Sequence, residues 1–206
     1  MRGSVLALFA SCALVTLAPL AAGATIIDDW ATVKVPAPPV LQSIAVDPAS
    51  TAMLVLDFVK QTCSGPRCTA AVPSVAKLLQ AARAKKVPVV YSYTATSTMA
   101  DTLPAVAPVG GEPAVVSGPD KFLNTELQAI LTKLNVKTIV LVGVSANGAA
   151  LYTASHAALS GYTVVVAVDG IPSETPYAEQ FVVWNLANAP RLSANVKLTT
   201  TDRVSF

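Results

Sequence analysis

Three apolar segments of the sequence each end at residues that could take part in chemistry. Asp57 closes the first segment and Tyr93 the second, and the third is followed by Ser145 and Asn147. A carboxylate can act as a general base, and hydroxyl and amide groups can orient a small molecule by hydrogen bonding. Ser145 and Asn147 also fit as caps of a following helix, which is their ordinary role. These four residues are the first candidates for a functional site.

Cysteine is the other residue type that could supply a nucleophile. The chain has three cysteines, Cys12, Cys63 and Cys68. Cys63 follows Asp57 by six residues and so belongs to the same end of its strand. Outside the cytosol, two cysteines this close most often form a disulfide, which here would give local rigidity rather than global stability. A disulfide is therefore the first interpretation, and a nucleophilic Cys63 is the alternative.

The elements that would position these residues alternate between strand and helix. The strands are continuously apolar, which is typical of strands buried on both faces. Such alternation predicts an α/β fold, a three-layer sandwich with a mostly parallel, Rossmann-like central sheet covered by helices on both faces. Ligands bind such sheets at the carboxyl ends of the strands. The expected strands are 53–58, 87–93, 136–143, 162–168 and 194–199. The expected helices are 73–83 (begun by Pro73), 122–134, 147–160 and 176–188. The segment 94–120 is expected to be a functional loop.

Three stretches of the sequence together resemble one known family. They are MLVLDF at 53–58, SGPDKFLNTELQAIL at 117–131 and TIVLVGVSANGAALYTASHAALSGYTVVVAVDG at 138–170. Over about residues 51–200, their order and spacing are similar to those of the isochorismatase-like cysteine hydrolases. The third stretch is the most specific of the three.

The resemblance implies a hydrolase in which an aspartate is the base, a lysine orients charge and a cysteine attacks an amide, ester or vinyl-ether substrate. A cysteine beside a cation and a helix start becomes a thiolate, and main-chain N–H groups there can hold the developing oxyanion. Asp57 matches the base. The cysteine position, six residues after Gly143, holds Ala149. A methyl group cannot attack a carbonyl, so thiol chemistry is expected to be lost.

The lysine of the family is harder to place in this chain. Counted from Phe122 and Thr125, its usual position falls near Val116. Lys121 fills the role only if the Gly118-Pro119 segment reshapes the loop. We take Lys121 as the candidate and leave this registration open.

The remaining polar residues are interpreted as structural. The single histidine, His156, lies about 10 Å along the helix from Ala149 and is expected to be a packed or half-exposed helix residue. One histidine cannot make the Asp-His-His metal site implied for the nicotinamidase-like branch, so no metal and no cofactor are expected. Glu174 and Glu179 are interpreted as capping or solvated charges, and Asp169 as support for a turn.

Composition limits the classes of partner. Of the 206 residues, 53% are hydrophobic and 13% are charged, against about 25% charged in an ordinary domain. The net charge is +2 and there is no basic stripe, which argues against a nucleic acid or an anionic membrane as partner. The expected partner is a small-molecule substrate or ligand. The low surface charge also leaves a homo-oligomer open.

The N-terminus predicts export. Arg2, the apolar run 5–22 and the small residues at 22–24 have the order of a secretory signal peptide over residues 1–24. An uncleaved membrane anchor is the alternative, because the run is just long enough to span a bilayer. With the signal cleaved, we expect a periplasmic or secreted protein with no membrane association. A proline-rich, extended arm would follow at 25–50, and the isochorismatase-like domain at 51–206.

Three functions remain open at this level. The first is a pseudoenzyme that binds a small molecule in the inherited pocket, without a nucleophile. The second is an active hydrolase of amides, esters or isochorismate-like substrates, in which Asp57 activates water or a substitute nucleophile acts. The third is a structural or interaction protein whose arm at 25–50 exchanges with a neighbouring subunit.

Overall fold

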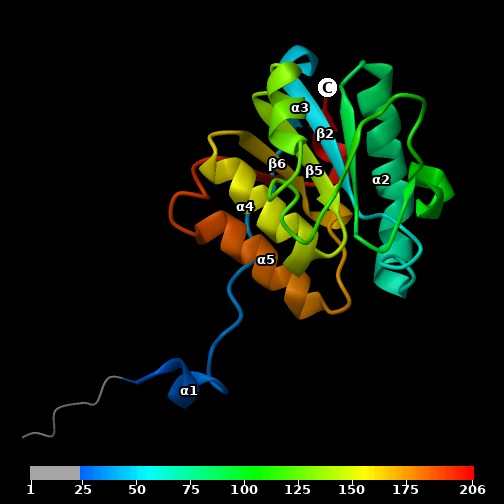
Figure 1. The fold of residues 1–206 in the computed structure, drawn as a ribbon. Coiled ribbons are helices and arrows are strands. Elements are labelled where there is room, and N and C mark those ends of the chain that lie inside the picture. The colour runs from blue at the N-terminus through cyan, green and yellow to red at the C-terminus, as the bar shows by residue number, and fades with distance from the viewer. Residues whose placement is uncertain (1–23) are drawn as a thin grey trace, which may run out of the picture. The chain divides into compact units, whose positions relative to one another are not determined.

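The computed structural model describes residues 24–206 of the chain (Figure 1), so the predicted signal peptide lies outside the described residues, apart from Ala24. The chain forms two units, one reaching to Pro36 and the other spanning Ala37–Phe206, and each is described by itself. The first contains a short helix, α1 (Ile26–Asp29). The main-chain N–H and hydroxyl of Thr25 both donate to Asp28 at 2.8 Å, and this cap explains a helical turn where the prolines predicted extended chain.

The second unit is built on a six-stranded sheet in which every pair of neighbouring strands is parallel. From the edge at β4 the strand order is β4-β3-β2-β5-β6-β7, so the direction of winding reverses between β2 and β5. In open α/β sheets, ligands commonly bind outside the carboxyl ends of the strands at such a reversal. The strands are β2 (Thr51–Leu56), β3 (Val89–Tyr93), β4 (Ala114–Val116), β5 (Thr138–Gly143), β6 (Thr163–Ala167) and β7 (Val196–Thr199).

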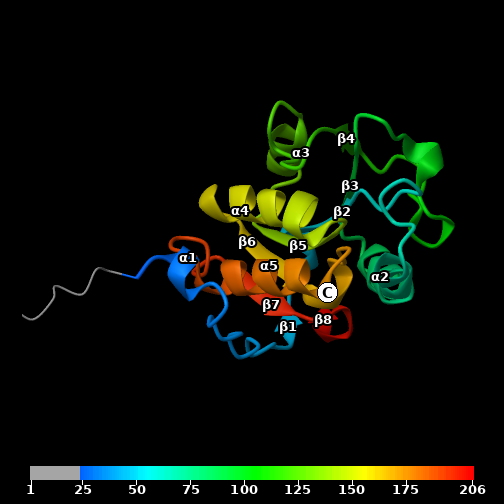
Figure 2. The same ribbon diagram turned by 90° about the horizontal axis from the view of Figure 1, so that it is seen from below.

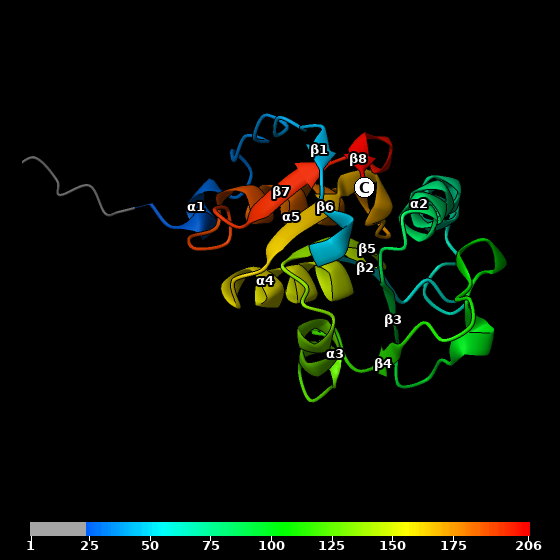
Figure 3. The same ribbon diagram turned by 90° about the horizontal axis from the view of Figure 1, so that it is seen from above.

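Helices cover both faces of the sheet, which confirms the predicted three-layer α/β fold. One face packs against α3 (Leu127–Lys133), α4 (Leu151–Leu159) and α5 (Pro176–Asn188). The other packs against α2 (Pro66–Ala84) and a small parallel pair, β1 (Ile44–Ala45) with β8 (Val204–Ser205). Figures 2 and 3 show these layers from below and from above. The short helical turns are Pro48–Ser50, Met99–Asp101, Pro104–Val106, Val168–Gly170 and Thr201–Arg203.

Part of the predicted arm is integrated into this second unit. The N–H of Gln42 donates to the carbonyl of Leu198 at 3.3 Å, and the hydroxyl of Thr199 donates to the carbonyl of Gln42 at 2.6 Å. Leu41 packs against the core on the side of α5. Residues from Ala37 onward therefore fold with the domain.

Two helices begin at residues other than those predicted. Helix α2 begins at Pro66 rather than Pro73, because Pro66 already supplies the favourable first position and the helix then continues through Pro73. Helix α3 begins at Leu127 rather than at residue 122. The preceding segment turns instead, with Asn124 at a φ of +56° and the Thr125 hydroxyl donating to the Lys121 carbonyl at 2.5 Å.

The predicted helix 147–160 is also divided. Its first part is a kinked turn, Ala146–Ala150, whose backbone leaves helical angles at Gly148, and α4 follows it.

Within the described residues, no helix is both long and apolar enough to cross a bilayer.

Candidate active site

Asp57 lies at the carboxyl end of β2, one of the two central strands between which the winding reverses. It directly follows β2, and its N–H donates to the carbonyl of Ser92 at 3.1 Å. Its φ is +52°, a left-handed conformation that is uncommon for a residue other than glycine. The Thr62 hydroxyl contacts the Asp57 carbonyl and holds the chain in this turn. The turn directs the carboxylate away from the path of the strand, as is common at functional sites.

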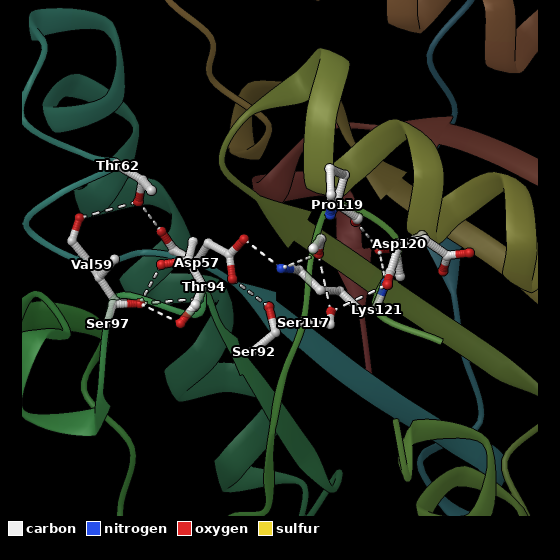
Figure 4. Close-up of polar contacts among 12 residues, drawn as sticks. Asp57, Val59, Thr62, Ser92, Thr94, Ser97, Ser117, Pro119, Asp120 and Lys121 are labelled. Atoms are coloured by element: carbon white, nitrogen blue, oxygen red, sulfur yellow. Dashed lines mark hydrogen bonds and ion pairs between the residues drawn. The ribbon is translucent and has the colours of Figure 1, made fainter. Parts of the chain in front are cut away.

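The carboxylate of Asp57 is paired on both oxygens (Figure 4). The Nζ atom of Lys121 lies 2.6 Å from Oδ2, and the hydroxyl of Ser92 donates to Oδ1 at 2.8 Å. Lys121 also donates from Nζ to the carbonyl of Gly118 at 2.9 Å. The side chains of Lys121 and Asp57 are only 1% and 5% exposed. The site therefore contains a buried, hydrogen-bonded ion pair, which is stable only when its polar atoms are satisfied in this way.

The loop that carries Lys121 is held by helix α4. The buried hydroxyl of Thr153 accepts from the Lys121 N–H at 3.2 Å and donates to the carbonyl of Pro119 at 3.3 Å. Val116, the other position considered for the lysine, lies at the end of edge strand β4 with its side chain exposed. Lys121 is thus the residue that the fold brings to Asp57.

Ala149 lies in the turn that enters α4. The N–H of Val144, at the end of β5, donates to the carbonyl of Leu56, so this chain segment continues beside the strand that ends in Asp57. Ala149 is buried, and Thr153, which holds the lysine loop, lies one helical turn further along α4. The methyl group of Ala149 therefore lies at the start of the helix that supports the Asp57–Lys121 pair.

Ser145 and Asn147 differ in how they meet their predicted roles. Ser145 occupies the cap position before the turn, where its carbonyl accepts from the N–H groups of Gly148 and Ala150, although its side chain caps nothing. Asn147 is not a cap, because it lies inside the turn. Its Oδ1 instead accepts from the Ser173 hydroxyl at 2.9 Å, which ties the turn to the loop before α5.

Tyr93 is buried at the end of β3, where the Thr102 hydroxyl donates to its phenolic oxygen at 3.4 Å. Burial raises the pKa of Tyr93 above the ordinary tyrosine value of 10.0. The phenol is therefore neutral near pH 7 and faces the loop that follows β3.

The two cysteines after Asp57 are bonded to each other. Cys63 and Cys68 form a disulfide with a Cα–Cα distance of 5.2 Å, so neither is a free thiol in this structure.

Arg67, which lies between the two cysteines in the sequence, pairs with Glu179 of α5, donating from Nε at 2.9 Å. Glu179 also accepts from the Ser173 N–H at 2.8 Å, so it links α2, α5 and the loop between β6 and α5 rather than being merely solvated.

His156 lies on α4 away from the paired carboxylate of Asp57. Its Nδ1 is 2.8 Å from Oδ2 of Asp120, and its ring stacks on Phe122 at 4.5 Å.

Asp169 accepts from both the N–H and the hydroxyl of Thr201, which makes it a tie between two turns, as predicted. Among the described residues, no group of three His, Cys, Asp or Glu side chains is arranged to hold a metal ion.

Ser92 completes the site, although the sequence analysis selected Tyr93 at this strand end and did not single out Ser92. It lies one position before the selected Tyr93, within a run predicted only as a strand end. The parallel register places Ser92 opposite Leu56, so its side chain reaches the residue that follows Leu56. A small polar residue within an otherwise apolar strand end was the signal available.

Known proteins resemble this chain in sequence. The isochorismatase domain matches residues 51–202. A secreted isochorismatase effector of Verticillium dahliae is 33% identical over 110 residues, covering 48% of this chain and 58% of that protein. An N-carbamoylsarcosine amidase of Arthrobacter sp is 26% identical over 164 residues, covering 66% of this chain and 61% of the enzyme. The chain thus spans about three fifths of the length of these two relatives.

Solved structures share the fold. An isochorismatase family protein from Burkholderia thailandensis superposes with a TM-score of 0.66 at 21% identity, covering 78% of this chain and 95% of that one. An N-carbamoylsarcosine amidase from Thermoplasma acidophilum gives a TM-score of 0.64 at 19% identity, covering 74% and 97%. The domain match spans most of the chain, and the order of strands and helices agrees with it. The chain belongs to the isochorismatase family.

Proposed function

We propose that this chain is an exported isochorismatase-family protein whose inherited site binds a small carbonyl compound without covalent thiol chemistry. The observation that carries the proposal is Ala149 at the position where the family resemblance calls for cysteine. Loss of a catalytic nucleophile lowers turnover by as much as about 10⁶-fold. Binding does not need that nucleophile, so it survives the replacement.

The retained pair suggests what the ligand is. Asp57 and Lys121 are together neutral, which favours a neutral ligand over a strongly charged one. The ammonium group has three N–H donors, and Asp57 and Gly118 take two of them. The third can donate to a carbonyl oxygen. A small amide or ester therefore fits this site, in keeping with the amidase among the relatives.

The test is to measure binding and turnover together. Calorimetric titration of the mature protein with a panel of small carboxamides and esters should detect binding, while chromatography of the same mixtures should detect no product. Asp57→Asn should weaken binding, because it frees Lys121 from its partner and alters the buried charge. Asp202→Asn, at an exposed turn near the C-terminus, is the matched control. Turnover by the unaltered protein that disappears in Asp57→Asn would overturn the proposal.

Export is supported by the order of charged, apolar and small residues over 1–24 and by the disulfide between Cys63 and Cys68. The secreted relative in Verticillium dahliae is in keeping with it. Mass spectrometry of the protein produced from its full-length sequence should find a mature chain that begins near residue 25. Recovery of the intact chain in the cytoplasm would contradict export.

A second candidate function is hydrolysis with Ser92 as a substitute nucleophile. The hydroxyl of Ser92 lies 2.8 Å from Oδ1 of Asp57, within nucleophile-to-base reach, and Lys121 orients that base. In this reaction Ser92 Oγ would bond to the ester carbonyl carbon and pass its proton to Asp57. The departing alcohol would take that proton as its C–O bond breaks, and water would then hydrolyse the acyl-enzyme. This candidate ranks second because Asp57 would have to accept the serine proton without the imidazole that usually activates a serine nucleophile.

A fluorophosphonate probe separates the two candidates, because it labels an activated serine. Labelling that is lost in Ser92→Ala and kept in Ser97→Ala would establish the second candidate. Ser97 is a suitable control because it is also buried, in the loop after β3. Absence of labelling, combined with measurable ligand binding, supports the first.

A further inference from the structure

A pair of charged side chains joins two helices that lie on opposite faces of the sheet. Arg67, in the first turn of α2, donates from Nε to Oε1 of Glu179 in α5 at 2.9 Å, and its Nη2 group contacts Oε2. Both helices begin beyond the carboxyl ends of strands, so the pair lies at the same edge of the sheet as Asp57. A two-point contact between a guanidinium and a carboxylate fixes orientation as well as distance.

The carboxylate of Glu179 also holds the loop that precedes α5. Its Oε1 atom accepts from the Ser173 N–H at 2.8 Å, and the Ser173 hydroxyl donates to Oδ1 of Asn147 at 2.9 Å. The same loop accepts a second contact, from the N–H of Ala146 to the carbonyl of Pro172 at 3.1 Å. Glu179 therefore supports the turn into α4, because the loop that it holds is attached to that turn at two points.

The other end of this chain of contacts reaches Asp57. Arg67 belongs to the disulfide loop, residues 63–68, which is closed by the bond between Cys63 and Cys68. The residue before this loop, Thr62, contacts the Asp57 carbonyl through its hydroxyl (Figure 4). The disulfide loop is thus connected to Asp57 on one side and, through side chains, to the turn into α4 on the other.

The stability of the fold does not explain this pair of charges. The side chains of Arg67 and Glu179 are 42% and 21% exposed, and ion pairs that solvent reaches contribute little to the free energy of unfolding. A site for a small molecule, in contrast, needs its groups held to within about 0.5 Å of their working positions by surrounding residues. The chain of contacts meets that need, because it joins the two sides of the site.

We propose that Glu179 is a positioning residue of the ligand site, which couples the disulfide loop to the turn into α4. This inference rests on the proposed function, since it assigns the turn and the Asp57–Lys121 pair to one ligand site. Glu179 acts through Ser173 and Asn147 and touches no ligand itself. The turn is fully held only after the disulfide has formed, which links the site to the oxidising compartment expected for an exported protein.

Hydrogen exchange of the ligand-free protein, followed by NMR spectroscopy at single residues, tests this coupling. The N–H groups of Gly148 and Ala150 donate to the Ser145 carbonyl and report on the turn. Glu179→Ala should speed their exchange by at least about tenfold, while the N–H groups of β5 keep their protection. Unchanged exchange at the turn, or equal acceleration in β5, would overturn the proposal.

Removal of the disulfide should have the same local effect. The double variant Cys63→Ser, Cys68→Ser should speed exchange at the same two N–H groups of the turn. Adding Glu179→Ala should then give no further acceleration, because both changes break one chain of contacts. Additive effects would show two independent supports and overturn the coupling. Arg67→Gln provides the same test with the disulfide intact if the double variant does not fold.

Two conservative variants separate positioning from a loss of charge. Glu179→Gln keeps an acceptor for the Ser173 N–H, so exchange at the turn should stay slow. Glu174→Gln removes an exposed carboxylate of the same loop and is the matched control, for which no change is expected. Acceleration by Glu174→Gln equal to that by Glu179→Ala would assign the effect to charge alone and overturn the proposal.

A thiol introduced by Ala149→Cys gives a readout of the site itself. Its thiolate attacks the acetyl carbon of p-nitrophenyl acetate, and a thioester forms as p-nitrophenolate leaves, which is followed by absorbance. Adding Glu179→Ala should lower this rate by about tenfold, whereas adding Glu179→Gln or Glu174→Gln should not. Equal rates with and without Glu179→Ala would overturn the positioning role. Failure of the proposed function is recognised separately, as turnover by the unaltered protein.

Discussion

The candidate site has two sides that differ in how well their residues match those that the family resemblance implies. On one side, Asp57, Lys121 and Ser92 form a buried network in which each side chain has a partner. On the other, the turn into α4 holds the buried Ala149 at the position where the family resemblance implies a cysteine. Burying an ion pair costs several kcal/mol in desolvation, whereas an alanine in a small-residue turn costs almost nothing. The buried ion pair, which is costly to desolvate, is present, and the residue that differs from the family pattern is the alanine at position 149. This combination favours a site that still recognises a ligand.

The largest expected effect comes from introducing a thiol at position 149. If only the nucleophile is absent, Ala149→Cys should raise hydrolysis of small amides or esters by about 10³-fold or more over the unaltered protein, as measured by product formation. Ala150→Cys, which places a thiol at the next buried position, is the control and should stay inactive. A thiol at position 149 that reacts rapidly with iodoacetamide but hydrolyses no substrate would show that Asp57, Lys121 and Ser92 do not support catalysis.

Removal of one charge from the paired side should strongly destabilise the fold. Lys121→Met leaves the Asp57 carboxylate buried without its counter-ion, so we expect a loss of about 3–5 kcal/mol in the free energy of unfolding, measured in urea. Arg67→Gln breaks the more exposed pair with Glu179 and should have a much smaller effect. Equal losses in the free energy of unfolding in the two variants would mean that the buried pair contributes no more to stability than the exposed pair.

The hydroxyl on the same side should contribute less. Ser92→Ala removes the donor to Oδ1 of Asp57, and an unpaired buried acceptor typically costs about 1–3 kcal/mol. The measurement is again the free energy of unfolding in urea. Ser155→Ala, at a half-exposed position on α4, provides the comparison and should change little. A negligible effect of Ser92→Ala would show that Asp57 finds another donor.

The smallest effect concerns the neighbouring phenol. Burial raises the pKa of Tyr93 above 10.0, so in the unfolded chain this group loses its proton at a lower pH than in the folded protein. Its contribution to stability is complete below pH 10 and declines as the pH rises above it. Urea unfolding between pH 8 and 11 should show this decline, and Tyr93→Phe should reduce its slope. Tyr177→Phe, at an exposed position, should leave the slope unchanged.

Strands were predictable in this protein because β2, β5 and β6 are buried on both faces and therefore continuously apolar. Their observed limits lie within two residues of the predicted ones. Helix starts were less predictable. Two prolines compete to begin α2, and the choice depends on how the preceding loop is held, which involves the disulfide and contacts distant in sequence.

The sequence by itself supplied the basis for proposing that thiol chemistry is absent, because Ala149 is identified by counting from Gly143 within one strand–turn–helix unit. It also determined the fold class and the place of Asp57 at a strand end. Only the tertiary structure decided that Lys121 rather than Val116 supplies the cation, and that Ser92 completes the pair. Both facts depend on the register between neighbouring strands and on the path of a long loop. Such contacts join residues far apart in the chain, and no local pattern encodes them.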